Sequence, residues 1–102
     1  MCNPYLTLAL ILAAGLDGID KHLALPSPFI ENAYEISPEQ LLCKEIDVLP
    51  GSLYDALVCM KQSEFVQNIL GIHLFESYLN EKTKEWNDYN QTVHQWEIQN
   101  YL

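Results

Sequence analysis

The most informative absence in this chain of 102 residues is arginine, because all of its positive charge comes from 5 lysines. Against them stand 14 acidic residues, which give a formal net charge of −9. A chain of that composition offers no basic patch to a phosphate backbone or to an anionic lipid surface. We therefore expect neither a nucleic-acid partner nor a membrane partner.

Cysteine is scarce as well, and its spacing is uninformative. The three thiols belong to Cys2, Cys43 and Cys59, with no CxxC pair and no paired histidines beside them. An odd number without such spacing argues against a disulfide framework and against a structural zinc site. We expect reduced, mostly buried thiols in a cytoplasmic protein.

Long hydrophobic runs and a basic leader are also missing. The apolar run from Leu8 to Ala14 is too short for a bilayer, which takes about 20 residues. No lysine precedes it, since the first is Lys21, so a secretory signal peptide is the weaker interpretation.

Signatures of catalysis are absent too. No serine, cysteine or lysine lies in a nucleophile motif, and no glycine-rich loop could hold a phosphate. His73 precedes Glu76 by one helical turn, and His94 precedes Glu97 in the same way. Two ligands per helix fall short of the four that a structural metal site uses, so we interpret these pairs as solvated or capping groups. The residues thus predict no catalytic, cofactor-binding or metal-binding residue.

What the sequence does contain is helical signal. Asn3 and Pro4 are typical of a helix start, and the residues through Ile19 are apolar on every side. The sequence predicts a buried helix here, at the centre of the fold. Shorter helices are predicted after Ser37 and Ser52, and another between Ser63 and Gly71.

A long amphipathic helix is predicted from Ile72 to Val93, followed by a short turn over 95–102. Its apolar stripe recurs at steps of three and four, with one gap, and consists of Ile72, Phe75, Leu79, Trp86, Tyr89 and Val93. The fold class is therefore mainly α. We expect Trp86 in the core, whereas Trp96 and Tyr101 fit a core and a docking surface equally well.

Several ungapped motifs carry a family resemblance. They are Asn3-Pro4-Tyr5-Leu6, Ala13-Ala14-Gly15-Leu16-Asp17-Gly18-Ile19, Leu49-Pro50, Ser52-Leu53, Ala56-Leu57, Gly71-x-His73-Leu74-Phe75-Glu76, Lys84-Glu85-Trp86, Val93-His94 and Trp96-Glu97. In this order they resemble the C-terminal region of bacterial type I glutamine synthetases. The resemblance implies that residues 1–102 form the helical C-terminal part, about the last quarter, of a glutamine synthetase catalytic domain.

The resemblance also implies an activity that this chain does not carry alone. Members of the family ligate glutamate and ammonia with ATP, using Mg²⁺ or Mn²⁺, and assemble as double-ring dodecamers. Their metal-binding strands, nucleotide pocket and phosphate-holding arginines precede the Asn-Pro-Tyr-Leu motif. We therefore expect a scaffold that makes oligomer contacts with other glutamine synthetase subunits, in place of a complete ligase.

Two site predictions follow from the resemblance. Family members send a C-terminal helix into the opposite ring, so residues 95–102 are predicted to be a docking tail anchored by Trp96, Tyr101 and Leu102. Tyr34 aligns loosely with a tyrosine that some members adenylylate, but the flanking Leu-Pro-Pro is absent. We expect Tyr34 to be unmodified and anchored in the fold. The alternative for the whole chain is an independent helical protein-binding module.

Overall fold

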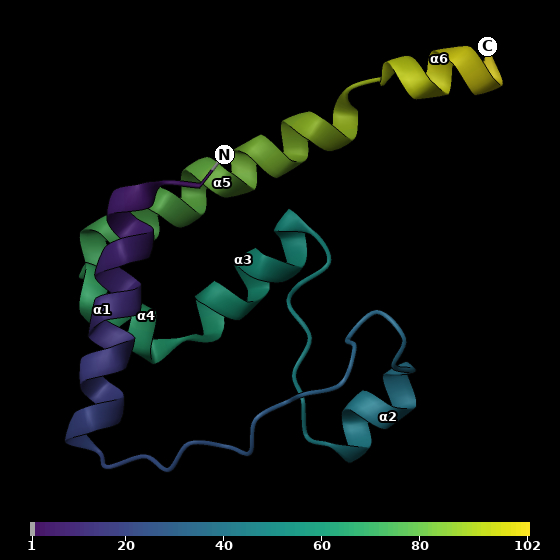
Figure 1. Ribbon diagram of the computed structural model, residues 1–102. Coiled ribbons are helices and arrows are strands. Elements are labelled where there is room, and N and C mark those ends of the chain that lie inside the picture. The colour runs from purple at the N-terminus through teal and green to yellow at the C-terminus, as the bar shows by residue number, and fades with distance from the viewer. Residues whose placement is uncertain (1) are drawn as a thin grey trace. The chain divides into compact units, whose positions relative to one another are not determined.

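A computed structural model describes residues 2–102, and its regular structure is helical throughout (Figure 1). The mainly α class is confirmed. The described residues contain no strand and form six helices: α1 (Pro4–Asp20), α2 (Pro38–Cys43), α3 (Leu53–Gln62), α4 (Glu64–Leu70), α5 (Ile72–Gln91) and α6 (Gln95–Tyr101). They belong to two units, one ending at Leu49 and the other running from Pro50 to Leu102.

Helix α1 begins as its sequence predicts. The Asn3 side chain accepts hydrogen bonds from the backbone N–H groups of Tyr5 (3.0 Å) and Leu6 (3.3 Å), and Pro4 occupies the first helical position. At the other end, Lys21 donates its backbone N–H to Asp17, and its ammonium pairs with the Asp17 carboxylate at 3.1 Å. The predicted limits, Asn3 to Ile19, differ from the observed ones by one residue at each end.

The burial predicted for α1 is not found among the described residues. None of its side chains is buried, and Leu8 and Leu12 each keep 66% of their surface exposed. The local signals for a helix lie within the segment itself, whereas burial needs neighbours that cover it. The helix therefore forms, but the predicted central position in a core is not realised.

The rest of the first unit is a long connection that carries α2. The prolines at positions 26 and 28 keep the following residues out of helical conformation. Helix α2 starts with the expected cap: Ser37 and Gln40 exchange side chain-to-backbone hydrogen bonds in a capping box. An ion pair between Lys44 and Glu31 joins the helix end to the preceding loop.

In the second unit, α3 and α4 pack against α5 around a small core. Ser52 caps α3 through the N–H of Asp55 (3.1 Å), and Ser63 caps α4 through that of Val66 (3.2 Å). Gly71 ends α4 at a φ of 79°, a left-handed value that glycine adopts at little cost. The sharp turn at Gly71 lets both α3 and α4 pack against α5.

Leu57 on α3 and Phe75 on α5 are the buried hydrophobic residues of the described chain, with exposed fractions of 9% and 5%. Along the predicted stripe of α5, Leu79 and Trp86 are half-buried, but Ile72, Tyr89 and Val93 remain more than half exposed. The predicted stripe faces α3 and α4, but these helices cover only part of it. Two helices are too little material to cover a helix of 20 residues.

The cysteine prediction is half right. Cys2, Cys43 and Cys59 are free thiols, as expected, but all three are exposed. The preference of free cysteine for the interior has little effect in a chain that buries so few side chains.

Candidate functional site

An aromatic row is the most organised feature of the second unit. Tyr54 on α3 lies 6.1 Å from Trp86 on α5, measured between ring centroids, and Trp86 lies 6.1 Å from Tyr89 with the two rings 23° from parallel. The row continues to His94, whose ring is 4.4 Å from that of Tyr89. Trp86 and Tyr89 are three residues apart and so share one face of α5. The row ties α3 to the end of α5.

The sequence indicated only part of this row. Helical spacing predicted that Trp86 and Tyr89 would share a face, but it did not show that Tyr54 would reach them. Ser52 marks the start of α3 and fixes its register, but a start signal does not say which side of a helix meets a neighbour. The contact depends on the angle between α3 and α5, which is a tertiary property.

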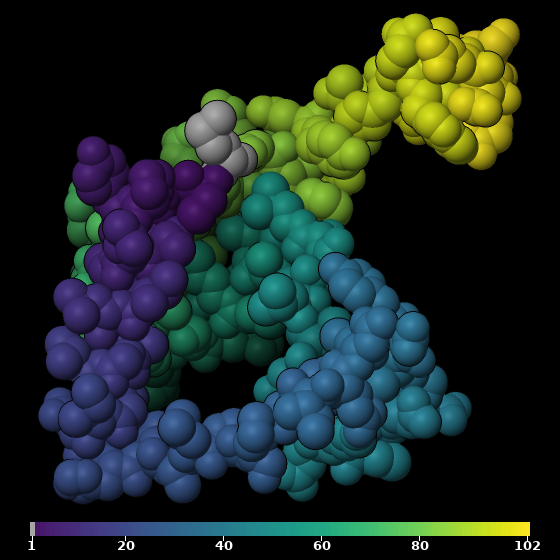
Figure 2. Space-filling model, in the orientation of Figure 1, coloured from purple at the N-terminus to yellow at the C-terminus, as the bar shows by residue number. Residues whose placement is uncertain are grey.

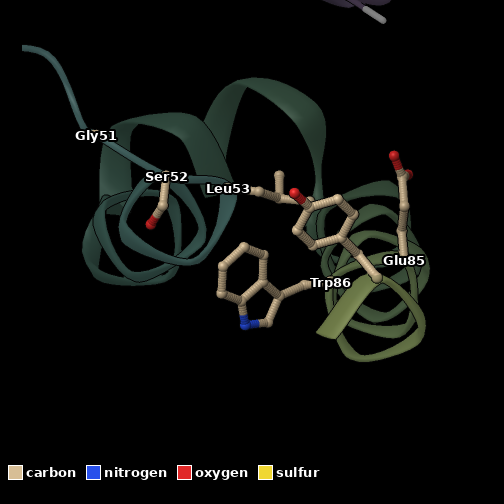
Figure 3. Close-up of a pocket in the computed structure, with 6 residues that line it drawn as sticks. Gly51, Ser52, Leu53, Glu85 and Trp86 are labelled. Atoms are coloured by element: carbon tan, nitrogen blue, oxygen red, sulfur yellow. The ribbon is translucent and has the colours of Figure 1, made fainter. Parts of the chain in front are cut away.

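A pocket of about 450 Å³ opens beside the row (Figure 3). Its lining comes from the start of α3 and the end of α5, and consists of Gly51, Ser52, Leu53, Glu85, Trp86 and Tyr89. The Ser52 hydroxyl is already engaged as a helix cap, and the Glu85 carboxylate points away from the Trp86 indole (Figure 3). Without a nucleophile beside a base, this pocket is suited to packing rather than to chemistry.

A larger groove of about 830 Å³ follows the contact between α3 and α5. Its lining combines the two buried residues, Leu57 and Phe75, with polar and charged groups that include Lys61, Glu76 and Asn80. A combination of apolar and polar groups is usual at a protein contact.

One ion pair on α5 shifts the pKa values of its two members. Lys82 Nζ donates to Glu85 Oε2 at 2.7 Å, one helical turn away. This hydrogen bond lowers the pKa of the Glu85 carboxyl and raises the pKa of the Lys82 ammonium, and Coulomb attraction acts in the same direction. Both groups are solvent-accessible, so the pair is a surface feature of α5 and not a poised acid or base.

The predicted docking tail forms a separate short helix. Three extended residues follow α5, and α6 then runs clear of α3 and α5 (Figures 1 and 2). Trp96 and Tyr101 meet edge to face at 5.5 Å, yet they stay 61% and 74% exposed, and Leu102 is 94% exposed. The three predicted anchors are thus accessible, and their docking role stays a prediction.

The two predicted histidine and glutamate pairs, His73 with Glu76 and His94 with Glu97, do not form part of a metal-binding group among the described residues. The Glu97 carboxylate accepts from the backbone N–H of His94 at 2.8 Å, which fits the predicted capping role. His73 lies exposed in the first turn of α5. Within residues 2–102, no three histidine, cysteine, aspartate or glutamate side chains gather as a metal-binding group.

Tyr34 is not anchored as expected. Its backbone N–H bonds to the Asn32 side chain, but its phenol side chain is 99% exposed. The loop around it provides no described neighbours that cover the ring. Its modification state stays a prediction.

In the part of the chain that the structure describes, no helix combines the length and the apolar character needed to cross a bilayer.

Comparison with known proteins identifies the family to which this helical segment belongs. A family model described as the glutamine synthetase catalytic domain matches residues 1–101. The glutamine synthetase of Thermus thermophilus is 42% identical over 101 residues, which are 99% of this chain and 23% of that protein. Those of Clostridium saccharobutylicum and Staphylococcus aureus are 42% and 41% identical over 100 residues, covering 23% and 22% of their lengths.

These matches show that the chain is a helical part of an enzyme's catalytic domain. The chain belongs to the glutamine synthetase family. It spans less than a quarter of the length of these relatives and corresponds to their C-terminal part. The predicted resemblance is confirmed.

Proposed function

We propose that this chain is the C-terminal scaffold of a glutamine synthetase catalytic domain and that it contributes oligomer contacts but no reacting group. The supporting observation is a match over 101 residues, 99% of this chain, to a protein that is more than four times as long. Phosphoryl transfer from ATP needs a divalent metal and cations around the transferring group. In this chain the 5 lysines are not aimed by any phosphate loop, and arginine is missing.

ATP and Mg²⁺ or Mn²⁺ belong, in this proposal, to the complete enzyme and are bound by residues outside this chain. When bound they would supply the phosphoryl group and neutralise its charge. Residues 2–102 would support that site from behind, because the helices are capped locally and can present a fixed surface. We place the complete enzyme in the cytoplasm, with other glutamine synthetase subunits as its partners.

A covalent chimera tests this proposal. The region of the Thermus thermophilus enzyme that matches this chain is replaced by this chain, and glutamine formation from glutamate, ammonia and ATP is measured. A matched control carries a flexible linker of the same length instead. We expect activity in the chimera and none in the control. A chimera as inactive as the control would overturn the proposed function.

The purified chain alone provides the complementary test. In a γ-glutamyl transferase assay with Mn²⁺ we expect no turnover, since residues 2–102 contain no cluster of three or more side chains that could hold the metal. Turnover that scales with the concentration of the chain, after removal of host enzyme, would contradict the scaffold assignment.

The docking tail is proposed to join subunits through its exposed aromatic residues. In the active chimera, removal of residues 95–102 should weaken the pairing of rings and leave single rings, as measured by size-exclusion chromatography with light scattering. A control variant, Gln99→Ala, alters the same helix without touching the three anchors. An assembly of unchanged mass after the truncation would disprove the tail assignment.

Tyr34 is proposed to remain unmodified in the complete enzyme. An exposed phenol is accessible to a transferase, but the flanking sequence of the modified site is missing. Intact mass after incubation with an adenylyltransferase and ATP decides the matter, and an added AMP on Tyr34 would refute it.

A further inference from the structure

The surface of α1 has more apolar area than the described chain can explain. Five of its large aliphatic side chains are more than half exposed, and helical spacing places them on one side of the helix: Leu8, Ile11, Leu12, Leu16 and Ile19. Patches of this kind on a soluble protein usually mark a contact with another chain. The charged side chains of α1 and its C-cap, Asp17, Asp20 and Lys21, all lie at the C-terminal end of the helix.

Two glycines on α1 add a geometric requirement. Gly15 and Gly18 lie on one face of the helix, and a Cβ placed on either would meet no atom within 4 Å. Glycine inside a helix costs about 1 kcal/mol relative to alanine. Nothing in the described part of the first unit fills the space that these glycines leave open, so a close neighbour from outside this unit would explain them.

The missing neighbour is best identified from length and charge. The chain spans only 23% of its Thermus thermophilus relative, so most of the polypeptide that surrounds this region in a complete enzyme lies outside it. A second copy of the chain is a poorer partner, because each copy carries a net charge of −9 and none has an arginine to offset it.

The helix is also prepared for docking before the partner arrives. Asn3 caps its start with two hydrogen bonds, and the bond from Lys21 to Asp17 closes its end, without help from another chain. Because α1 supplies the caps at both of its ends, we expect less conformational entropy to be lost when it binds.

We propose that this chain can dock in trans on a glutamine synthetase polypeptide that lacks the matching C-terminal region, through α1 with Gly15 and Gly18 at the closest approach. This inference rests on the proposed function and adds a property to it. In this proposal, the contacts made through α1 are enough to complete the truncated enzyme without a peptide bond.

Complementation tests the proposal. Thermus thermophilus glutamine synthetase, truncated before its matching region and carrying an affinity tag, is titrated with this chain, and the two are also produced together in the same cells. We expect the untagged chain to co-purify at one copy per truncated subunit. We also expect Mn²⁺-dependent γ-glutamyl transferase activity to rise with added chain and to saturate.

The sharpest variant is Gly15→Leu. A Cβ at position 15 meets no atom of the described chain within 4 Å, and leucine favours the helix more than glycine does, so helicity by circular dichroism should stay the same or rise. At a close contact the same side chain overpacks, and the half-saturating concentration should increase about tenfold or more. The control, Asp20→Leu, places the same leucine side chain on α1 away from the two glycines and should change that concentration less than about twofold.

Each outcome decides the proposal. Saturable complementation that Gly15→Leu weakens and Asp20→Leu does not would support docking through α1. Complementation that is insensitive to Gly15→Leu would overturn the assigned surface. Absence of any complex in the co-produced sample, while the covalent chimera is active, would overturn docking in trans and leave the proposed function intact. An inactive chimera is the separate outcome that refutes the function itself.

Discussion

At the scale of single residues, this chain is organised by hydrogen bonds that mark where helices begin. Asn3, Ser37, Ser52 and Ser63 each accept from backbone N–H groups of the first turn. These groups would otherwise lack a partner inside the helix. Because such a bond spans only two or three residues, it can be predicted from sequence and it forms without a surrounding core.

The cap on α3 yields a first prediction. Ser52→Ala removes the acceptor of the Asp55 N–H and should lower the free energy of unfolding of the second unit by about 1 kcal/mol. Urea unfolding followed by circular dichroism measures the change. The control, Ser77→Ala, makes the same chemical change at an exposed position inside α5 and should have a smaller effect. Equal effects at the two positions would argue against the cap.

The pair of Lys82 and Glu85 predicts a limited dependence on pH. Because the pKa of Glu85 is lowered in the folded chain, the pair stabilises α5 above the ordinary carboxyl value of 4.5 and loses this effect as pH falls. The pKa of Lys82 is raised, so the effect is present below 10.5 and is lost as pH rises further. In Lys82→Met, NMR titration should show the Glu85 pKa moving upward, whereas Lys84→Met should leave it in place. An unmoved Glu85 pKa in Lys82→Met would show that the pair does not form in solution.

At the scale of elements, periodicity located the helices but could not say how far each would be covered. The predicted helix from Ile72 to Val93 corresponds to α5, which ends at Gln91. Only Phe75 of its stripe is buried, because α3 and α4 are short and meet it along part of its length. The same limit applies to α1, where an apolar sequence predicted burial and the side chains are exposed. Burial depends on neighbours that lie outside the segment.

Phe75 provides the prediction for this scale. Phe75→Ala should destabilise the packing of α3 and α4 on α5 by about 3 kcal/mol, because it removes a buried ring and leaves a cavity. Trp86 fluorescence during urea unfolding, in a Trp96→Phe background, reports on this unit. Leu74→Ala is the control, since Leu74 is 41% exposed and its loss should cost clearly less. Similar losses for both variants would mean that Phe75 does not lie in the core.

At the scale of the whole molecule, the family could be recognised from sequence because its motifs are spread over nearly the full length of the chain. The aromatic row and its pocket could not, because Tyr54 meets Trp86 only through the angle between two helices. The three tail anchors were selected by residue type, and their exposure agrees with a role in docking without establishing it. In this protein the family could thus be predicted from the sequence as a whole, whereas the individual sites could not.

The exposed apolar surface leads to the last prediction. With Leu57 and Phe75 as the buried hydrophobic residues described, the isolated chain should bind 1-anilinonaphthalene-8-sulfonate and unfold over a broad temperature range, since little packing has to be lost together. The complete Thermus thermophilus enzyme, at the same concentration of subunits, is the control and should bind less dye per subunit. A sharp melting transition in a dye-free monomer would favour an independent module, because such cooperativity requires a closed core. If the dye is bound and then displaced as the truncated enzyme is added, the apolar surface of the chain is the surface that the enzyme covers.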